Sequence, residues 1–263
     1  MSLWECPICK ENLEQKEKQF VCKNNHQFDI AKQNYINLLM SQISKDKQHG
    51  DSKEMVLARS NFLEKGYYTV FRDTLESISS QYVPTSVLDI GCGEGWYAEN
   101  LSVPNLYGID ISKEAIKLAT RRLPQYQFAV ASSYALPIVS DSIDLAYSIF
   151  APFKIEEVHR VLREGGIFIE VFPLPKHLYD LKHILYDKPY LNPEYTTEYE
   201  GFELLEVKKV SDAIKIETSE DIHNLFMMTP YYHRTPESNK KRLAVFVEMN
   251  TDIGFGFAIF RKK

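Results

Sequence analysis

The chain has 263 residues, which is long enough for one large α/β domain and a small additional segment. Its hydrophobic share of 44% is typical of a soluble globular protein, and no apolar run approaches the ~18–20 residues of a membrane span, so we expect no membrane partner. The net charge of −5 argues against broad nonspecific binding of nucleic acid, while the lack of an apolar export signal and the four cysteines favour a reducing, cytoplasmic location.

The first segment carries a cysteine and histidine pattern that can bind a metal. Cys6 and Cys9 are separated by two residues, twelve residues follow, and Cys22 and His26 are then separated by three. A Cys-x-x-Cys pair can also run a thiol redox cycle or form a disulfide, but no βαβ pattern surrounds it and a reducing cytoplasm disfavours a disulfide. Tetrahedral zinc takes four ligands of this kind, and a closed set leaves no open position for catalysis. We therefore predict a structural zinc ion held by these four residues in a zinc-binding domain over residues 1–40.

The next segment, residues 41–82, is predicted to be a helical linker or lid. Its stretch DSKEMVLARSNFLEKG, residues 51–66, has apolar positions at helical spacing. Asp51 and Glu54 fit a capping box at the start of this helix, and Gly66 fits the position just past its end. Such a helix can simply pack on the core, or it can lie as a lid across the mouth of a ligand site.

A glycine-rich loop between a predicted strand and a predicted helix indicates a nucleoside ligand. In SVLDIGCGEGWYAENL, a buried strand leads into glycines at 91, 93 and 95, and a helix is predicted to start near Trp96. Glycines at such a turn let the backbone approach a ligand at the carboxyl edge of the sheet. A second strand, NLYGID, ends in Asp110, and an acidic residue at this position binds a ribose diol.

Two cofactor classes compete for this loop. A dinucleotide site prefers G-x-G-x-x-G with space for a pyrophosphate on the helix. In this chain the carboxylates of Asp89 and Glu94 flank the glycines, which disfavours phosphate and suits a cofactor that carries a sulfonium and an ammonium group. The loop therefore favours S-adenosylmethionine over NAD.

The rest of the chain alternates strand-like and helical segments, which predicts an α/β fold. Helices are predicted near residues 111–122, 154–163, 176–186 and 219–228. Eight strand candidates compete for the seven places of a mostly parallel sheet with a terminal antiparallel hairpin, so we expect one candidate to be wrong. The candidates lie near residues 87, 106 and 127 and at 142–150, 166–172, 202–210, 244–249 and 254–260.

The chain resembles the bacterial 23S rRNA (guanine-N1)-methyltransferases, which have the class I, Rossmann-like methyltransferase fold. The resemblance runs almost end to end and rests on the stretches CPIC…VCKNNHQFDIAKQNYINLL, GDSKEM…AR…FL, VLDIGCGEGWY, VASSYALP, IFAP, REGG, PLPKHLYDLK and MMTP. One difference is the loop SKDKQHGD, which is shorter than in the relatives and is a candidate for contact with RNA. The resemblance implies a methyltransferase domain over residues 83–263 after the zinc segment and the linker.

The resemblance also implies site residues and partners, and its zinc ligands fall on the four residues identified from their spacing. The family's cofactor contacts fall on Tyr68, Gly93, Glu94 and His177. The general fold adds Asp89, Gly91, Asp110 and, near the adenine, Ser132 and Ser133. The expected substrate is a hairpin loop in domain II of 23S rRNA, with S-adenosylmethionine as methyl donor and the zinc segment contributing to RNA recognition. Relatives also suggest a homodimer.

The motifs narrow the choice of the atom that is methylated. Enzymes that methylate exocyclic amines carry an Asp/Asn-Pro-Pro-aromatic motif after the fourth strand, whereas this chain has Ile149-Phe150-Ala151-Pro152 there. Methylation at pyrimidine C5 requires a cysteine nucleophile, but three cysteines are assigned to zinc and Cys92 lies in the glycine loop. A ring nitrogen or a hydroxyl remains, which agrees with guanine N1.

Guanine N1 carries a proton and lies on the Watson–Crick edge, so the target must be unpaired and must lose that proton. Aromatic side chains that could stack on the base are Phe150, Phe153, Phe172, Tyr231 and Tyr232. The catalytic base stays unassigned, because Asp141, Asp144 and Glu170 fit structural roles equally well.

Two other functions fit parts of the sequence. A small-molecule methyltransferase explains residues 86–190 equally well but leaves the zinc segment without a role. An RNA-binding module with a degenerate cofactor pocket is the third alternative, and the intact glycine loop and Asp110 argue against it.

Overall fold

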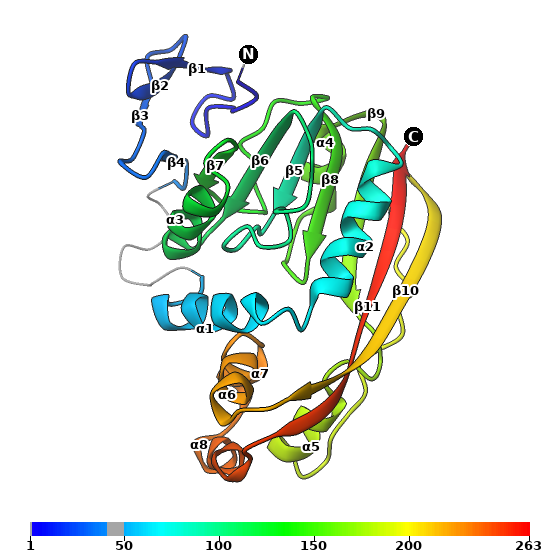
Figure 1. The fold of residues 1–263 in the computed structure, drawn as a ribbon. Coiled ribbons are helices and arrows are strands. Elements are labelled where there is room, and N and C mark those ends of the chain that lie inside the picture. Colours follow the sequence, from blue (N-terminus) through cyan, green and yellow to red (C-terminus); the bar gives the residue numbers. More distant parts are fainter. Residues whose placement is uncertain (1, 41–49) are drawn as a thin grey trace.

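The computed structural model describes residues 2–40 and 50–263 (Figure 1). Its centre is an eight-stranded sheet in the order β10-β11-β9-β8-β5-β6-β7-β4. Strands β4 to β9 run parallel to one another, and β11 pairs antiparallel with both β9 and β10. The strands are β4 (Tyr35–Asn37), β5 (Ser86–Ile90), β6 (Asn105–Asp110), β7 (Gln127–Val130), β8 (Ile143–Ile149), β9 (Leu162–Pro173), β10 (Phe202–Ile216) and β11 (Met249–Lys262). Most of the loop SKDKQHGD lies outside the described residues.

The predicted α/β fold with a mostly parallel sheet is confirmed, but its strand count of seven is wrong by one. The eighth strand is β4, which pairs with β7 so that Tyr35 lies opposite Phe128. The candidate strand at 244–249 is also wrong, because most of it belongs to the short 3₁₀ helix η1 (Lys241–Val245) and the segment after it. Its alternating valines, Val245 and Val247, are 79% and 72% exposed, so the alternation does not mark a buried face.

The zinc segment forms a separate three-stranded antiparallel sheet and then joins the main sheet through β4. Its strands are β1 (Leu13–Lys16), β2 (Gln19–Cys22) and β3 (Gln27–Asp29). Trp4 anchors the segment to the main sheet, because its indole Nε1 donates to Gln127 Oε1 at 2.9 Å and its ring lies edge-on to Tyr107 at 5.2 Å. Residues 2–40 therefore pack on the rest of the chain and are not a loose appendage.

Helices and the zinc segment bury the two faces of the main sheet. The helices are α1 (Lys53–Glu64), α2 (Thr69–Ser80), α3 (Lys113–Arg122), α4 (Ile155–Val161), α5 (Tyr179–Leu185), α6 (Ser219–Met227), α7 (Tyr231–Arg234) and α8 (Glu237–Lys240). Apolar residues of α2, α3, α5 and α6 share one core, whereas α4 and the zinc segment share the other. Strand β5 is buried along its whole length, as expected for a central parallel strand covered on both faces.

Helix α1 lies where it was predicted, but its N-terminal cap differs. Ser52 caps it, accepting a hydrogen bond from the backbone N–H of Met55 at 3.3 Å, and Asp51 instead pairs with Arg59. A serine therefore satisfies the helix terminus, and the Asp51 carboxylate is engaged by Arg59. Gly66 has a φ of +82°, which confirms its position just past the helix end.

The helix predicted near Trp96 is wrong. Residues 96–100 form successive turns, with hydrogen bonds from Ala98 N–H to Gly95 O (3.2 Å) and from Leu101 N–H to Ala98 O (3.0 Å). These bonds span three residues rather than four, so the segment is tighter than an α-helix. Strand β6 follows at Asn105, so turns and a short extended segment connect the glycine loop to it.

Strands β10 and β11 extend well past the rest of the sheet as a long hairpin. Figure 1 shows α5 to α8 gathered at the far end of this hairpin, away from the zinc segment. Among the residues that the structure describes, no helix is both long and apolar enough to cross a membrane.

Candidate metal centre and cofactor site

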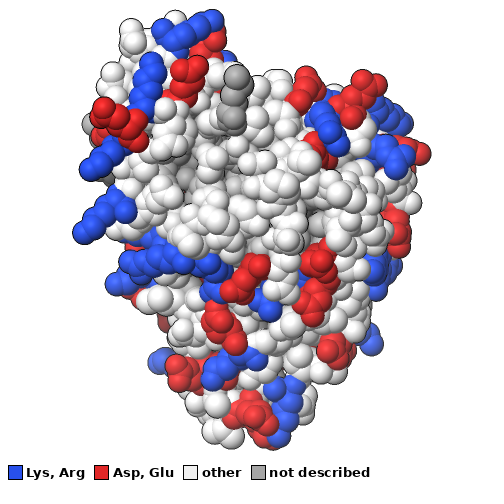
Figure 2. Space-filling view, turned by 45° about the horizontal axis from the view of Figure 1, so that its top comes forward, with Lys and Arg blue, Asp and Glu red and all other residues white. Residues whose placement is uncertain are grey.

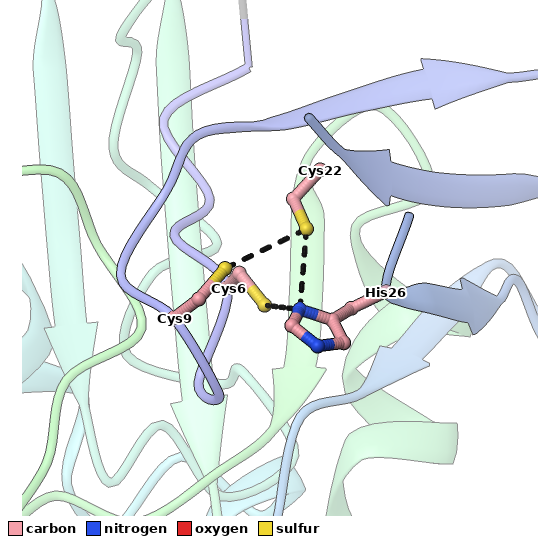
Figure 3. Close-up of side chains that lie close together, drawn as sticks. All are labelled: Cys6, Cys9, Cys22 and His26. Carbon is pink, nitrogen blue, oxygen red and sulfur yellow. Dashed lines mark hydrogen bonds between the residues drawn. The ribbon is translucent and has the colours of Figure 1, made fainter. Parts of the chain in front are cut away.

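The four predicted zinc ligands converge on one point (Figure 3). The Nδ1 atom of His26 lies 3.5 Å from Cys6 Sγ and 3.4 Å from Cys22 Sγ, and the Cys9 and Cys22 sulfurs are 3.6 Å apart. A tetrahedral zinc ion with ordinary bond lengths has ligand–ligand edges of about 3.5–3.8 Å, so the donor set fits this metal. The set is closed at four protein ligands, as a structural site requires.

Two tight turns bring the ligands together. The backbone N–H of Lys10 donates to Cys6 O at 2.9 Å, and that of Asn25 donates to Cys22 O at 2.9 Å. Asn25 has a φ of +60°, a conformation that asparagine tolerates better than most residues. Cys22 ends β2 and His26 precedes β3, so the small sheet fixes the second pair against the first.

The glycine loop after β5 packs tightly under the segment that follows β8. The backbone N–H groups of Gly91 and Cys92 both donate to Ile109 O at 2.9 Å. Gly91 has a φ of +76°, and a Cβ added to it would lie 2.2 Å from the Cβ of Ala151. A side chain at this position would therefore push apart the two backbone segments that form the carboxyl edge of the sheet.

Asp110 at the end of β6 is fixed by backbone donors. Its Oδ2 accepts from Gly93 N–H at 3.0 Å and its Oδ1 from Ser112 N–H at 2.7 Å. Burial raises the pKa of this carboxyl, whereas the two backbone bonds and Arg59 oppose that rise. The arrangement orients the carboxylate at the place where the sequence predicts a ribose diol.

Asp89 lies beneath the glycine loop. It is 3% exposed, and its Oδ2 accepts a hydrogen bond from the hydroxyl of Tyr147 at 2.7 Å. Burial raises its pKa from the ordinary 3.8 to about 7, although the Tyr147 hydrogen bond opposes this. Its predicted role in cofactor binding stays a prediction, and contact through the loop backbone fits its position better than direct contact.

The raised pKa of Asp89 predicts a pH dependence of stability. Between about pH 4 and pH 7 the folded protein holds a proton that the unfolded chain has lost, so the unfolding free energy should fall as pH rises. For Asp89 alone the fall is at most roughly 4 kcal/mol. Denaturant unfolding at several pH values should therefore show a flatter profile for Asp89→Asn than for the wild type. The same slope in both proteins would contradict the assignment.

Tyr68 and His177 lie together beside Phe255. Their ring centroids are 6.1 Å apart, and both side chains are buried. His177 Nδ1 accepts from Gly254 N–H at 3.2 Å, so the ring proton sits on Nε2. Burial, with a contribution from Lys182, lowers the pKa of His177 to about 3, so it stays a neutral donor at physiological pH.

Tyr68 points an unpartnered group into the same region. Its hydroxyl is buried and makes no hydrogen bond among the residues that the structure describes. A buried donor without a partner costs free energy, so a ligand atom that accepts a hydrogen bond from this hydroxyl would recover that cost. Ser132 and Ser133 follow β7 at the same edge of the sheet, where both are half-buried.

The three acidic candidates for a catalytic base make structural contacts elsewhere. Asp144 accepts from the backbone N–H groups of Thr85 and Ser86 at 2.7 and 3.0 Å. Asp141 pairs with Lys262 at 2.7 Å. Glu170 accepts from the hydroxyls of Tyr195 and Tyr199 at 2.6 and 3.0 Å, on the opposite face from Tyr68.

Most of the aromatic candidates for stacking on the target base also pack against other parts of the protein. Phe153 lies edge-on to Phe168, and Phe172 stacks on Tyr195 at 3.9 Å. Tyr231 and Tyr232 belong to the helical cluster at the far end of the hairpin. Phe150 is 46% exposed and lies 5.7 Å from His177, so it is the candidate that faces solvent beside the site.

The structure adds one charged residue that the sequence did not single out. Arg59 of α1 pairs with Asp51 at 2.6 Å and reaches the glycine loop. Two signals were available in the sequence: Arg59 lies on a helix that either packs on the core or forms a lid, and it belongs to the stretch GDSKEM…AR…FL that resembles the family. A sequence does not show which side chain of such a helix points inward.

Comparisons with known proteins match both parts of the chain. Residues 4–47 match the zinc-ribbon family described as "RlmA, N-terminal", and residues 88–169 match the family described as "Methyltransferase domain". A 23S rRNA (guanine(748)-N(1))-methyltransferase of Streptomyces fradiae is 32% identical over 67% of this chain, a match that spans 65% of that protein.

Two further relatives carry similar names. A putative 23S rRNA (guanine-N(1)-)-methyltransferase of Micromonospora griseorubida is 31% identical over 67% of this chain and 67% of its own length. One of Bacillus subtilis is 28% identical over 95% of this chain and 93% of its own. The methyltransferase-domain match covers the glycine loop and β6, and the zinc-ribbon match contains all four cysteine and histidine ligands.

Proposed function

This chain belongs to the 23S rRNA (guanine-N1)-methyltransferase family, and we propose that it transfers a methyl group from S-adenosylmethionine to N1 of a guanine in a hairpin loop of 23S rRNA domain II. The observation that carries the proposal is the union in one chain of the family's zinc ribbon with a methyltransferase domain. Methyl transfer to a domain II transcript tests it. Transfer to small metabolites alone would favour the small-molecule alternative.

The proposal assigns each part of the chain a role. Residues 1–40 hold a structural zinc ion and contribute to RNA recognition, residues 41–82 form a linker and lid, and residues 83–263 bind the cofactor and target base. The cofactor, which supplies an electrophilic methyl group, would be held by Tyr68, Asp89, Gly91, Gly93, Glu94, Asp110, Ser132 and His177. The unpartnered hydroxyl of Tyr68 and the glycine cradle support this assignment.

The chain's own contribution to the reaction is mainly positioning. Guanine N1 must lose its proton, but His177 cannot accept it at neutral pH, because its Nδ1 is engaged by Gly254 and its Nε2 already carries a proton. Its Nε2–H is instead a donor for an oxygen of the cofactor or base. Holding N1 in line with the methyl group can lower the barrier substantially without a covalent step.

Phe150 is the residue that we assign to stacking on the target guanine. Its backbone has a φ of +55°, an unusual conformation for a bulky residue and one that clusters at functional sites. The next residue, Ala151, packs on the glycine loop, so an exposed ring at 150 lies beside the region where the methyl group would be delivered. An unpaired base stacks well on such a ring.

Replacing Phe150 by alanine should lower methyl transfer to the transcript by about 10-fold to 100-fold, the worth of one base–aromatic stack. Phe150→Trp should restore most of the activity, since it keeps an aromatic face. Calorimetry with S-adenosylhomocysteine should give wild-type affinity for both variants. Equal loss of cofactor affinity and activity in Phe150→Ala would show that the ring supports the cofactor site instead.

The tip of the β1–β2 hairpin is the RNA-contact element that we favour in the zinc segment. Lys16 and Lys18 flank this turn, both are exposed, and neither forms an ion pair among the residues that the structure describes. Figure 2 shows Lys and Arg side chains, with Asp and Glu side chains among them, along the left of this face, beside a largely uncharged centre. Exposed cations can contact the phosphates of an RNA hairpin, and a neighbouring uncharged surface can contact the unstacked bases of its loop.

Changing Lys16 and Lys18 together to glutamate should weaken binding of a domain II hairpin by about 10-fold at low salt, and should flatten the salt dependence by roughly 1.5 in logarithmic slope. Fluorescence polarisation across a salt series measures both quantities. The matched control is Lys188→Glu with Lys241→Glu. These two exposed lysines lie among the helices at the far end of the β10–β11 hairpin, away from the zinc segment. An equal effect of both pairs would contradict a specific role for the zinc segment.

A further inference from the structure

Arg59 enters the cofactor site from the lid helix α1. Its Nη2 donates to Asp51 Oδ2 at 2.6 Å, and its Nη1 lies 3.8 Å from the position that a Cβ on Gly93 would take. Burial opposes its charge, but the carboxylates of Asp51, Glu94 and Asp110 outweigh this and raise its pKa. A charged guanidinium is therefore held over the backbone of the glycine loop.

Glu94 lies beside Arg59 with part of its hydrogen-bonding capacity unused. The side chain is 1% exposed, and its Oε1 makes no hydrogen bond among residues 2–40 and 50–263. Leaving a buried carboxylate oxygen without a donor is costly, so such an atom in a ligand site indicates a donor supplied by the ligand. An ammonium group is the natural donor for it.

The two groups together match the charges of an α-amino acid. A guanidinium with free donors can bind a carboxylate through two parallel hydrogen bonds, and the neighbouring carboxylate can accept from an ammonium group. We propose that Arg59 binds the carboxylate of the cofactor's methionyl group while Glu94 receives its ammonium. The inference rests on the proposed function only for the identity of the cofactor. It makes Arg59, on helix α1, a residue that selects ligands with a carboxylate.

Two rival roles for Arg59 give different results. If it only pins α1 to the glycine loop through Asp51, its loss weakens every ligand of the site equally. If Arg59 instead occupies the place of the cofactor's own cationic group and must move away when the cofactor binds, its loss tightens cofactor binding. A carboxylate clamp alone predicts a loss that depends on whether the ligand has a carboxylate.

The test is calorimetry with two ligands and three variants of the full chain. The ligands are S-adenosylhomocysteine and its decarboxylated analogue, which keeps the amine. Arg59→Met should weaken S-adenosylhomocysteine binding by about 10-fold to 100-fold and leave the analogue's affinity unchanged. Arg59→Lys should recover part of the loss. Arg121→Met, which removes an exposed arginine of α3, should bind both ligands as the wild type does.

Each outcome decides between the alternatives. Equal weakening of both ligands, tighter binding, or no change in Arg59→Met would overturn the proposal. Binding of the analogue by Arg59→Met shows in the same experiment that the variant is folded. If the wild type binds S-adenosylhomocysteine but methylates no ribosomal RNA, the proposed function fails while this inference stands. If the wild type does not bind it, both fail.

Discussion

Cys22→Ser is expected to abolish zinc binding and to unfold the first 40 residues. Cys22 and Cys6 are buried, and both belong to the core that joins the zinc segment to the main sheet. A segment this short cannot bury enough apolar surface by itself, so the metal supplies much of its folding free energy. The expected cost is about 3 kcal/mol or more, since a closed four-ligand site loses one ligand and its apolar neighbours become exposed.

Metal content and the fluorescence of Trp4 measure this effect. Trp4 is 1% exposed, and a Trp96→Phe background leaves it as the chain's one tryptophan. Cys22→Ser, or a strong chelator, should shift its emission to the red and remove about one zinc ion per chain. Cys92→Ser is the control, because this thiol lies in the glycine loop and should leave the zinc content unchanged. Full zinc content in Cys22→Ser would contradict the assignment.

Gly91→Ala is expected to lower cofactor affinity at least about 100-fold and to destabilise the fold by roughly 2–4 kcal/mol. The added methyl group would lie 2.2 Å from the Cβ of Ala151, and the φ of +76° adds backbone strain. Because the clash is with the Cβ of Ala151, whose Cα lies only 3.8 Å from the added methyl group, it is relieved when the segment after β8 moves away from the glycine loop or when the Ala151 methyl group is removed. The measurements are calorimetry with S-adenosylhomocysteine and denaturant unfolding.

Gly165→Ala separates strain from steric clash. Gly165 has a similar φ of +71°, but a Cβ there meets nothing within 4 Å. We expect it to cost about 1 kcal/mol and to leave cofactor affinity unchanged. Adding Ala151→Gly to Gly91→Ala should recover much of the affinity, since it removes the nearest contact. If Gly91→Ala and Gly165→Ala show the same cofactor affinity and stability, the tight packing of the glycine loop against Ala151 does not determine cofactor binding.

Much of the site could be predicted because its signals are local. The spacing of Cys6, Cys9, Cys22 and His26 is a property of two short turns, and the structure brings their ligand atoms within 4.8 Å of one another. The strand before the glycine loop and Asp110 at the end of β6 are likewise encoded in short, contiguous patterns. Such patterns persist whatever surrounds them.

The features that were missed depend on distant parts of the chain. Strand β4 has only three residues and is a strand because β7 offers it an edge, not because of its own sequence. The alternation at 244–249 suggested a strand, but those valines have no sheet to pack against. Arg59 gained its position from tertiary packing of α1 over the loop, and no local pattern marks which way it points.

The most direct test of the proposed reaction is methyl transfer from labelled S-adenosylmethionine to a 23S rRNA domain II transcript, followed by mass spectrometry of the nucleosides. The zinc-loaded wild type should produce 1-methylguanosine in a single hairpin loop, visible also as a primer-extension stop. Protein that binds zinc and S-adenosylhomocysteine, yet leaves both this transcript and intact ribosomal RNA unmodified, would contradict the proposed function.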